Sequence, residues 1–125
     1  MKPSIARLPD AELEVMQALW ACEPPATRAC IEQTLRSVHP MAPTTLLTLL
    51  SRLTDKQFVH AEKQGRLLLY TPLVTEQAYL ASQSSRFFHT LCGGSLRAFA
   101  SALCDSGLTP EELQELRDLL ERDAL

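Results

Sequence analysis

The sequence lacks the features that mark membrane proteins, secreted proteins and the common enzyme classes. No stretch approaches the roughly 18 consecutive apolar residues that a membrane-spanning helix needs. The start of the chain has no apolar signal-peptide core. The chain also contains no glycine-rich phosphate loop, no H-E-x-x-H and no G-x-S-x-G motif. We therefore expect a cytoplasmic protein that is not an enzyme, binds no cofactor and inserts into no membrane.

The four cysteines form no recognisable metal-binding or redox motif. They are Cys22, Cys30, Cys92 and Cys104, and no two of them make a C-x-x-C or C-x-C pair. Such cysteines are most often small buried hydrophobic residues or free thiols. The alternative is a zinc or copper site that joins them to His39, His60 or His89, but no spacing in the sequence supports it. We expect no metal site.

Positive charge is scarce and unevenly distributed. The net charge is −3 at pH 7, which argues weakly against a nucleic-acid partner. Residues 1–72 nevertheless carry eight Lys/Arg against seven Asp/Glu, whereas residues 73–125 carry four against eight. Any surface that binds an anion is therefore expected in the first part of the chain.

Two short helices are expected before residue 40. The stretch LPDAELEVMQALW predicts a first helix that starts near Pro9–Asp10, with Asp10 capping free N–H groups. The two prolines of ACEPPA end it. Thr27 is expected to cap the second helix, which the turn SVHPM follows. The residues expected to face the core are Leu13, Val15, Met16, Leu19, Trp20, Ile31, Leu35 and Val38.

The stretch TTLLTLLSRL predicts a third helix with two distinct faces, from about Ala42 to Lys56. Pro43 suits its first turn, where a missing N–H is no loss. The buried stripe consists of Leu46, Leu49, Leu50 and Leu53. The opposite stripe consists of Thr44, Thr48, Ser51 and Asp55, with Leu47 and Arg52 at its edges. Taken alone, the polar stripe is explained by contact with solvent.

The stretch FVHAEKQGRLLLYTPL predicts a β-hairpin with its turn at Gln64–Gly65. Three short helices followed by a hairpin is the order of a winged helix-turn-helix domain, which we assign to residues 1–73. In that arrangement the third helix enters the major groove of DNA and the hairpin, or wing, lies along the backbone. Short side chains allow the helix to approach base edges closely. Longer basic side chains are then placed to meet phosphates: Arg52, Lys56, Lys63 and Arg66.

Residues 74–125 predict three amphipathic helices with little to pack against in a monomer. The third opens with a capping box, in which Thr109 is the N-cap, Pro110 the first helical residue and Glu112 the reciprocal partner. A helical dimerisation domain is the simplest explanation, so the expected fold class is mainly α with a small β-hairpin wing. The residues expected to support dimerisation are Tyr79, Leu80, Phe87, Phe88, Leu91, Leu96, Phe99, Leu103, Leu113, Leu116, Leu119 and Leu120.

Five segments in order give the chain a resemblance to a known family. They are LPDAELEVMQALW, APTTLLTLLSRL, GRLLLYTPLVTEQAYL, GGSLRAFASAL and LTPEELQELRDLLE. Together they resemble the penicillinase-repressor family. The resemblance implies a homodimeric transcriptional repressor that binds an inverted-repeat operator in double-stranded DNA, often TACA/TGTA-like. Many members are inactivated when a membrane-bound zinc metallopeptidase sensor triggers their cleavage, so such a sensor is a candidate partner.

The resemblance also suggests roles for particular residues. The usual Asn-Phe cleavage pair appears here as Ala102-Leu103, the candidate position for regulatory cleavage. Leu47 stands where a long polar residue is common in the family. The full set expected to contact DNA is Thr27, Pro43, Thr44, Thr45, Leu47, Thr48, Ser51, Arg52, Lys56, Lys63 and Arg66. The alternative function is a winged-helix protein–protein interaction module with weak or no DNA binding, in which Leu47 belongs to an adhesive face.

Overall fold

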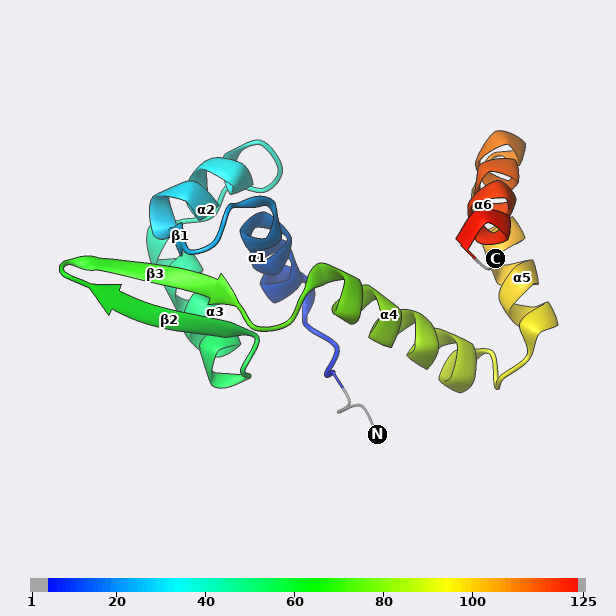
Figure 1. Cartoon of the computed structure of the whole chain (residues 1–125), viewed down its shortest axis with the longest axis horizontal. Helices are drawn as coiled ribbons and strands as arrows, with labels where there is room; N and C mark the ends of the chain where they lie inside the picture. The colour runs from blue at the N-terminus through cyan, green and yellow to red at the C-terminus, as the bar shows by residue number, and fades with distance from the viewer. Residues whose placement is uncertain (1–4, 124–125) are drawn as a thin grey trace. The chain divides into compact units, whose positions relative to one another are not determined.

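The computed structural model in Figure 1 describes residues 5–123 and is mainly helical, with one small antiparallel sheet, as the sequence predicted. The chain divides into two compact units, the first ending at Gln83 and the second beginning at Ser84. The expected boundary after residue 73 concerns independently folding domains and stays a prediction.

Helix α1 spans Asp10–Ala21 and follows Pro9. Asp10 is its first helical residue, and no side-chain hydrogen bond caps the helix, so the expected capping by Asp10 is wrong. The carboxylate still lies in the first turn, where negative charge opposes the positive end of the helix dipole. The buried side of α1 carries Val15, Met16 and Leu19.

Helix α2 spans Arg28–Arg36 and begins as the sequence predicted. The Cys30 backbone N–H donates to the Thr27 Oγ1 over 3.2 Å, which confirms Thr27 as the cap. Ile31 and Leu35 face the core. Val38 does not, and the expectation for it was wrong: the helix ends at Arg36, so Val38 lies in the following turn and is 78% exposed.

Helix α3 spans Pro43–Asp55, and its four-leucine stripe is buried as expected. Leu46, Leu49, Leu50 and Leu53 lie in the same core cluster as α1 and α2. Burying a leucine side chain contributes roughly 1.5–3 kcal/mol. The stripe therefore fixes the rotation of α3 about its axis, and with it the direction in which the opposite face points.

The sheet joins three strands in the order β1-β3-β2, all antiparallel. Strand β1 is Ala26–Thr27, a short edge strand that was not predicted from the sequence. Strands β2 (Val59–Gln64) and β3 (Leu67–Pro72) form the expected hairpin, visible as the long green ribbon pair in Figure 1. Its two central turn residues are Gly65 and Arg66, one position later than predicted. Gly65 has φ 62°, a backbone conformation that glycine adopts without strain.

Helix α4 spans Glu76–Arg86, and its first turns belong to the core of the first unit. Tyr79 is 3% exposed, and its hydroxyl accepts a 2.9 Å hydrogen bond from the Leu8 backbone N–H. Its ring packs beside Trp20 and Phe58. This corrects the expectation that Tyr79 supports dimerisation, because its side chain has almost no surface left for a second chain.

The second unit continues with η1, a π-helical turn over Phe87–Leu91, then α5 (Leu96–Asp105) and α6 (Pro110–Asp123). The sequence predicted a continuous α-helix where η1 lies. Phe99 contacts both Phe87 and Phe88 edge-on, with ring centroids 5.6 and 5.7 Å apart. The capping box at the start of α6 is confirmed by reciprocal bonds of 3.0 and 3.1 Å between Thr109 and Glu112. From Ser84 to Asp123 no side chain is fully buried in the single chain.

Candidate DNA-binding surface

The outward face of α3 is a strip of small and uncharged side chains with one arginine beside it. We use the name reading face for Thr44, Leu47, Thr48 and Ser51, all of which are exposed. Arg52 is exposed next to them. The helix starts at Pro43 with Ala42 before it, and no side chain caps its first N–H groups. Those N–H groups carry the positive end of the helix dipole.

The hydroxyl of Thr48 is already engaged within the helix. Its Oγ1 donates to the Thr44 carbonyl oxygen over 3.0 Å. This bond to the preceding turn is a common arrangement for threonine in a helix. Because the Thr48 hydroxyl points back to the backbone, the group that Thr48 leaves free for a partner is its methyl group. The reading face is therefore less polar than the letters T, T and S suggest.

Lys56, expected to meet a phosphate, has an internal partner. Its Nζ lies 2.6 Å from Oε1 of Glu12, which belongs to α1 and is only 3% exposed. A buried carboxylate needs a counter-charge, because desolvation strongly penalises an unpaired one. The ion pair ties the end of α3 to α1. Lys56 therefore has a structural role, and its expected contact with a phosphate stays a prediction.

The wing carries two exposed basic residues, Lys63 at the end of β2 and Arg66 in the turn. No carboxylate within residues 5–123 makes a salt bridge with either of them or with Arg52. Leu67 and Leu68, at the start of β3, are exposed beside them. Lys63 and Leu68 are directly paired across the hairpin and so share one side of the sheet. Sequence reasoning placed the two leucines in a hairpin strand and did not single them out as exposed.

At the N-terminus of α2, the side-chain oxygen of Thr27, an expected DNA contact, already accepts a hydrogen bond within the protein. Thr27 is half-buried, and its side-chain oxygen accepts the helix-capping bond. Arg28, which follows it, forms a 3.3 Å ion pair with Glu32 one turn along the helix. Such exposed pairs contribute little and exchange easily. Arg28 is therefore an exposed cation at the start of α2 that sequence reasoning did not single out.

The cysteines include one close pair that the spacing did not reveal. Cys22, just after α1, has its Sγ 2.9 Å from the Sγ of Cys30 in α2, and both are free thiols. Burial, followed by the contact with Cys30, raises the pKa of the Cys22 thiol above its ordinary value. Among residues 5–123, no three His, Cys, Asp or Glu side chains gather as metal ligands.

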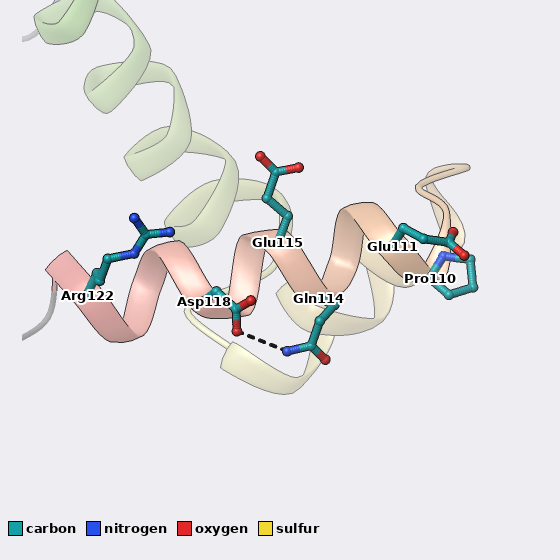
Figure 2. Close-up of a pocket in the computed structure, with 6 residues that line it drawn as sticks. All are labelled: Pro110, Glu111, Gln114, Glu115, Asp118 and Arg122. Carbon is teal, nitrogen blue, oxygen red and sulfur yellow. Dashed lines mark hydrogen bonds between the residues drawn. The ribbon is translucent and has the colours of Figure 1, made fainter.

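A shallow hollow in the second unit lies along one side of α6, and Figure 2 shows its lining residues. Glu111, Glu115 and Asp118 make it acidic, and Gln114 Nε2 donates to Asp118 Oδ1 over 3.0 Å. All of its lining residues belong to one helix and are exposed. It is the solvated polar side of an amphipathic helix.

No helix among the described residues is long and apolar enough to cross a membrane.

A helix, a short edge strand, two further helices and a hairpin, in this order, define a winged helix-turn-helix DNA-binding protein, in which α3 directly precedes the hairpin. A model of the penicillinase repressor family matches residues 8–122. The chain therefore belongs to that family, a family of DNA-binding transcriptional repressors rather than enzymes, as its motifs predicted.

Particular relatives agree over nearly the whole chain. The penicillinase repressor of Bacillus licheniformis is 33% identical over 118 residues, which cover 94% of this chain and 91% of that protein. The methicillin resistance regulatory protein MecI of Mammaliicoccus sciuri is 26% identical over 113 residues, which cover 90% of this chain and 91% of that protein.

One solved structure among the relatives includes DNA. It is the solution structure of monomeric BlaI from Bacillus licheniformis in complex with the blaP half-operator. The match has 33% sequence identity and a TM-score of 0.50, and it covers 60% of this chain and 90% of that one. The similarity supports the fold and the family.

Proposed function

We propose that this protein is a sequence-specific transcriptional repressor that acts as a homodimer on an inverted-repeat operator. The observation that carries the proposal is the orientation of α3. Four buried leucines hold one side of the helix against the core, and the reading face points outward on the other side. A helix with small outward side chains fits closely into the major groove.

Basic side chains around α3 are the proposed contacts to the DNA backbone. Arg52 borders the reading face, and Lys63 and Arg66 lie on the wing. Pro43 and Thr45, both exposed at the start of α3, and Thr27 complete the proposed surface. Phosphate contacts position a protein on the duplex, while base-edge contacts select the sequence. Because these three basic side chains are the proposed phosphate contacts of each copy, we expect binding to be electrostatically light.

Dimerisation is proposed to bury the apolar side chains of the second unit and of the end of α4. Leu91 is 76% exposed in the single chain, and Leu80, Leu96, Leu119 and Leu120 are exposed as well. Apolar residues this numerous in a short segment favour association with a second chain. A two-fold dimer presents two copies of α3, which matches the symmetry of an inverted repeat. Phe87, Phe88, Phe99, Leu103, Leu113 and Leu116 are proposed to support this interface from its half-buried interior.

Control by proteolysis is proposed at Ala102-Leu103, with a membrane-bound metallopeptidase sensor as the partner that triggers it. Both residues are half-buried in the middle of α5. A protease binds an extended segment, so α5 must unwind locally before cleavage. Cleavage there would separate α6 from the rest of the chain and weaken the dimer. We place the protein in the cytoplasm, where operator DNA is accessible.

A second candidate, a protein–protein interaction module, is favoured by one observation. Leu47 is 38% exposed on the reading face, and the protein carries a net charge of −3. An apolar residue on a weakly charged face also suits a protein partner. The two functions make different predictions for duplex DNA.

The test uses the full chain with a random-sequence duplex library, followed by titration of the enriched duplex and of a scrambled duplex of equal composition. A specific repressor binds its own site about 10³-fold or more tightly than unrelated DNA. Sedimentation at micromolar concentration should give twice the chain mass. Failure to enrich any sequence would reject the repressor function and favour the protein partner, and a monomer in sedimentation would reject the dimer.

A further inference from the structure

Leu47 lies at one edge of the polar stripe of α3 and is exposed on the reading face, although every other leucine of α3 is buried. It is 38% exposed, whereas Leu46 and Leu50 are nearly inaccessible. Thr44 lies three residues before it and Ser51 four residues after it, so all three share one side of the helix. A lone exposed leucine on a protein surface is ordinary. At this position, however, it is the largest side chain that the reading face can place against a base pair.

The neighbours of Leu47 make its surroundings still less polar. Thr48 donates its hydroxyl hydrogen to the Thr44 carbonyl oxygen and so presents a methyl group. Lys56, at the end of the same helix, is held by the buried Glu12 carboxylate. The part of the face formed by Leu47 and the Thr48 methyl group thus offers mainly carbon to a partner, and Arg52 is the cation at the other edge.

The major groove displays one apolar group that can match such a surface. Thymine carries a C5-methyl group there, while the other bases present hydrogen-bond donors and acceptors alone at their edges. Burying a polar base edge against leucine without a partner is unfavourable. A leucine in the groove therefore discriminates in favour of thymine and against cytosine, whose amino group needs an acceptor.

We propose that Leu47 is a specificity-determining residue that recognises thymine through its C5-methyl group, with the Thr48 methyl extending the apolar contact. This inference rests on the proposed function and specifies the base that the repressor selects. Part of the sequence preference then comes from apolar contact with Leu47. The alternative source is hydrogen bonding from the threonine hydroxyls to base edges.

The expected size of the effect follows from the area of one methyl group. Burying a CH₂-sized group contributes about 0.8 kcal/mol, which corresponds to about a fourfold change in the dissociation constant. If one thymine methyl is contacted in each half-site, removing both should weaken binding by about fifteenfold.

The experiment replaces thymine by deoxyuridine, which lacks only the C5-methyl group. The probe is the duplex that the full chain enriches from a random-sequence library, synthesised with symmetric thymine-to-uracil changes, one position at a time. Three proteins are titrated: the unchanged chain, Leu47→Ala and Leu73→Ala. Leu73 is an exposed leucine outside α3 and serves as the matched control. Thermal unfolding shows that each variant is folded.

We expect at least one uracil change to weaken binding by the unchanged chain and by Leu73→Ala about fifteenfold, and to weaken binding by Leu47→Ala much less, since only the Thr48 methyl group then remains. A second variant, Thr48→Val, keeps the methyl group and should retain the thymine preference, whereas Thr48→Ser should reduce it. If every uracil duplex binds the unchanged chain as tightly as the original, or if the loss persists in Leu47→Ala, the inference is wrong while the repressor function stands. If no duplex is enriched at all, the proposed function itself fails.

Discussion

The ion pair between Glu12 and Lys56 gives the most demanding test of how α3 is positioned. The two atoms, Glu12 Oε1 and Lys56 Nζ, are 2.6 Å apart, and the carboxylate is buried. Lys56→Met removes the ammonium and leaves the carboxylate without its partner. Breaking a fully buried pair costs about 3–5 kcal/mol. Because 39% of the Lys56 side chain is exposed, water screens part of this loss, and we expect about 2 kcal/mol.

Further variants separate the interaction between Glu12 and Lys56 from the contribution of each side chain alone. Glu12→Gln leaves Lys56 able to turn towards water and should cost about 1 kcal/mol. The double change Glu12→Met with Lys56→Met removes both charges, so it should be less destabilising than Lys56→Met alone. The coupling between the two sites should be about 1–2 kcal/mol. The assay is urea unfolding of the full chain by circular dichroism, at one fixed protein concentration because association contributes to stability.

A DNA titration completes this test. If Lys56 serves α1 rather than a phosphate, Lys56→Met should bind the enriched duplex with an unchanged salt dependence once the protein is folded. The reasoning is refuted if the double variant is as unstable as Lys56→Met, since the buried carboxylate would then not be the cause. The structural role of Lys56 is also contradicted if Lys56→Met makes the slope of log K against log salt shallower by about one unit per copy, because Lys56 would then contact a phosphate.

Three further predictions concern charge, packing and cysteine chemistry. If Arg52, Lys63 and Arg66 contact phosphates as proposed, a dimer makes about six phosphate contacts, and the slope of log K against log salt should be near −5. Arg52→Ala should make this slope shallower by about one unit per copy. A slope steeper than about −9 would show that other cations bind DNA. Leu50→Ala should lower the free energy of unfolding by about 2–5 kcal/mol, because Leu50 belongs to the buried stripe of α3. Leu47→Ala, on the exposed side, should change it by less than about 0.5 kcal/mol. Equal effects of the two variants in urea unfolding would contradict this division of α3 into a buried and an exposed side. At pH 8 a maleimide should modify the exposed Cys104 first, and Cys22 slowly, because burial raises the Cys22 pKa and keeps it protonated; mass spectrometry showing equal rates would contradict this.

Hydrophobic spacing predicted the helices and the direction of α3 because that information is local. The four leucines recur at spacings of three and four, and one side of a helix is all that such a pattern has to specify. The capping roles of Thr27 and Thr109 were also predictable, since each cap bonds an N–H only three residues away.

The missed features depend on contacts between distant parts of the chain. Lys56 looks like a free cation until Glu12, 44 residues earlier, is placed beside it. Tyr79 appeared to belong to an interface, but its hydroxyl meets the backbone of Leu8 across 71 residues. Val38 was misplaced because α2 ends two residues before it, and boundaries are weakly encoded in sequence. The internal bond of Thr48 is local, but no letter in the sequence shows which rotamer a threonine adopts.

The central claim is that α3 and the wing, rather than any other surface, bind DNA. Amide chemical shifts of the ¹⁵N-labelled full chain, recorded with increasing amounts of the enriched duplex, test it without any mutation. We expect the largest changes at residues 43–52 and 63–68, with smaller ones at the start of α2. Changes concentrated on α5 and α6, or on the solvent side of α1, with α3 unaffected, would contradict the account.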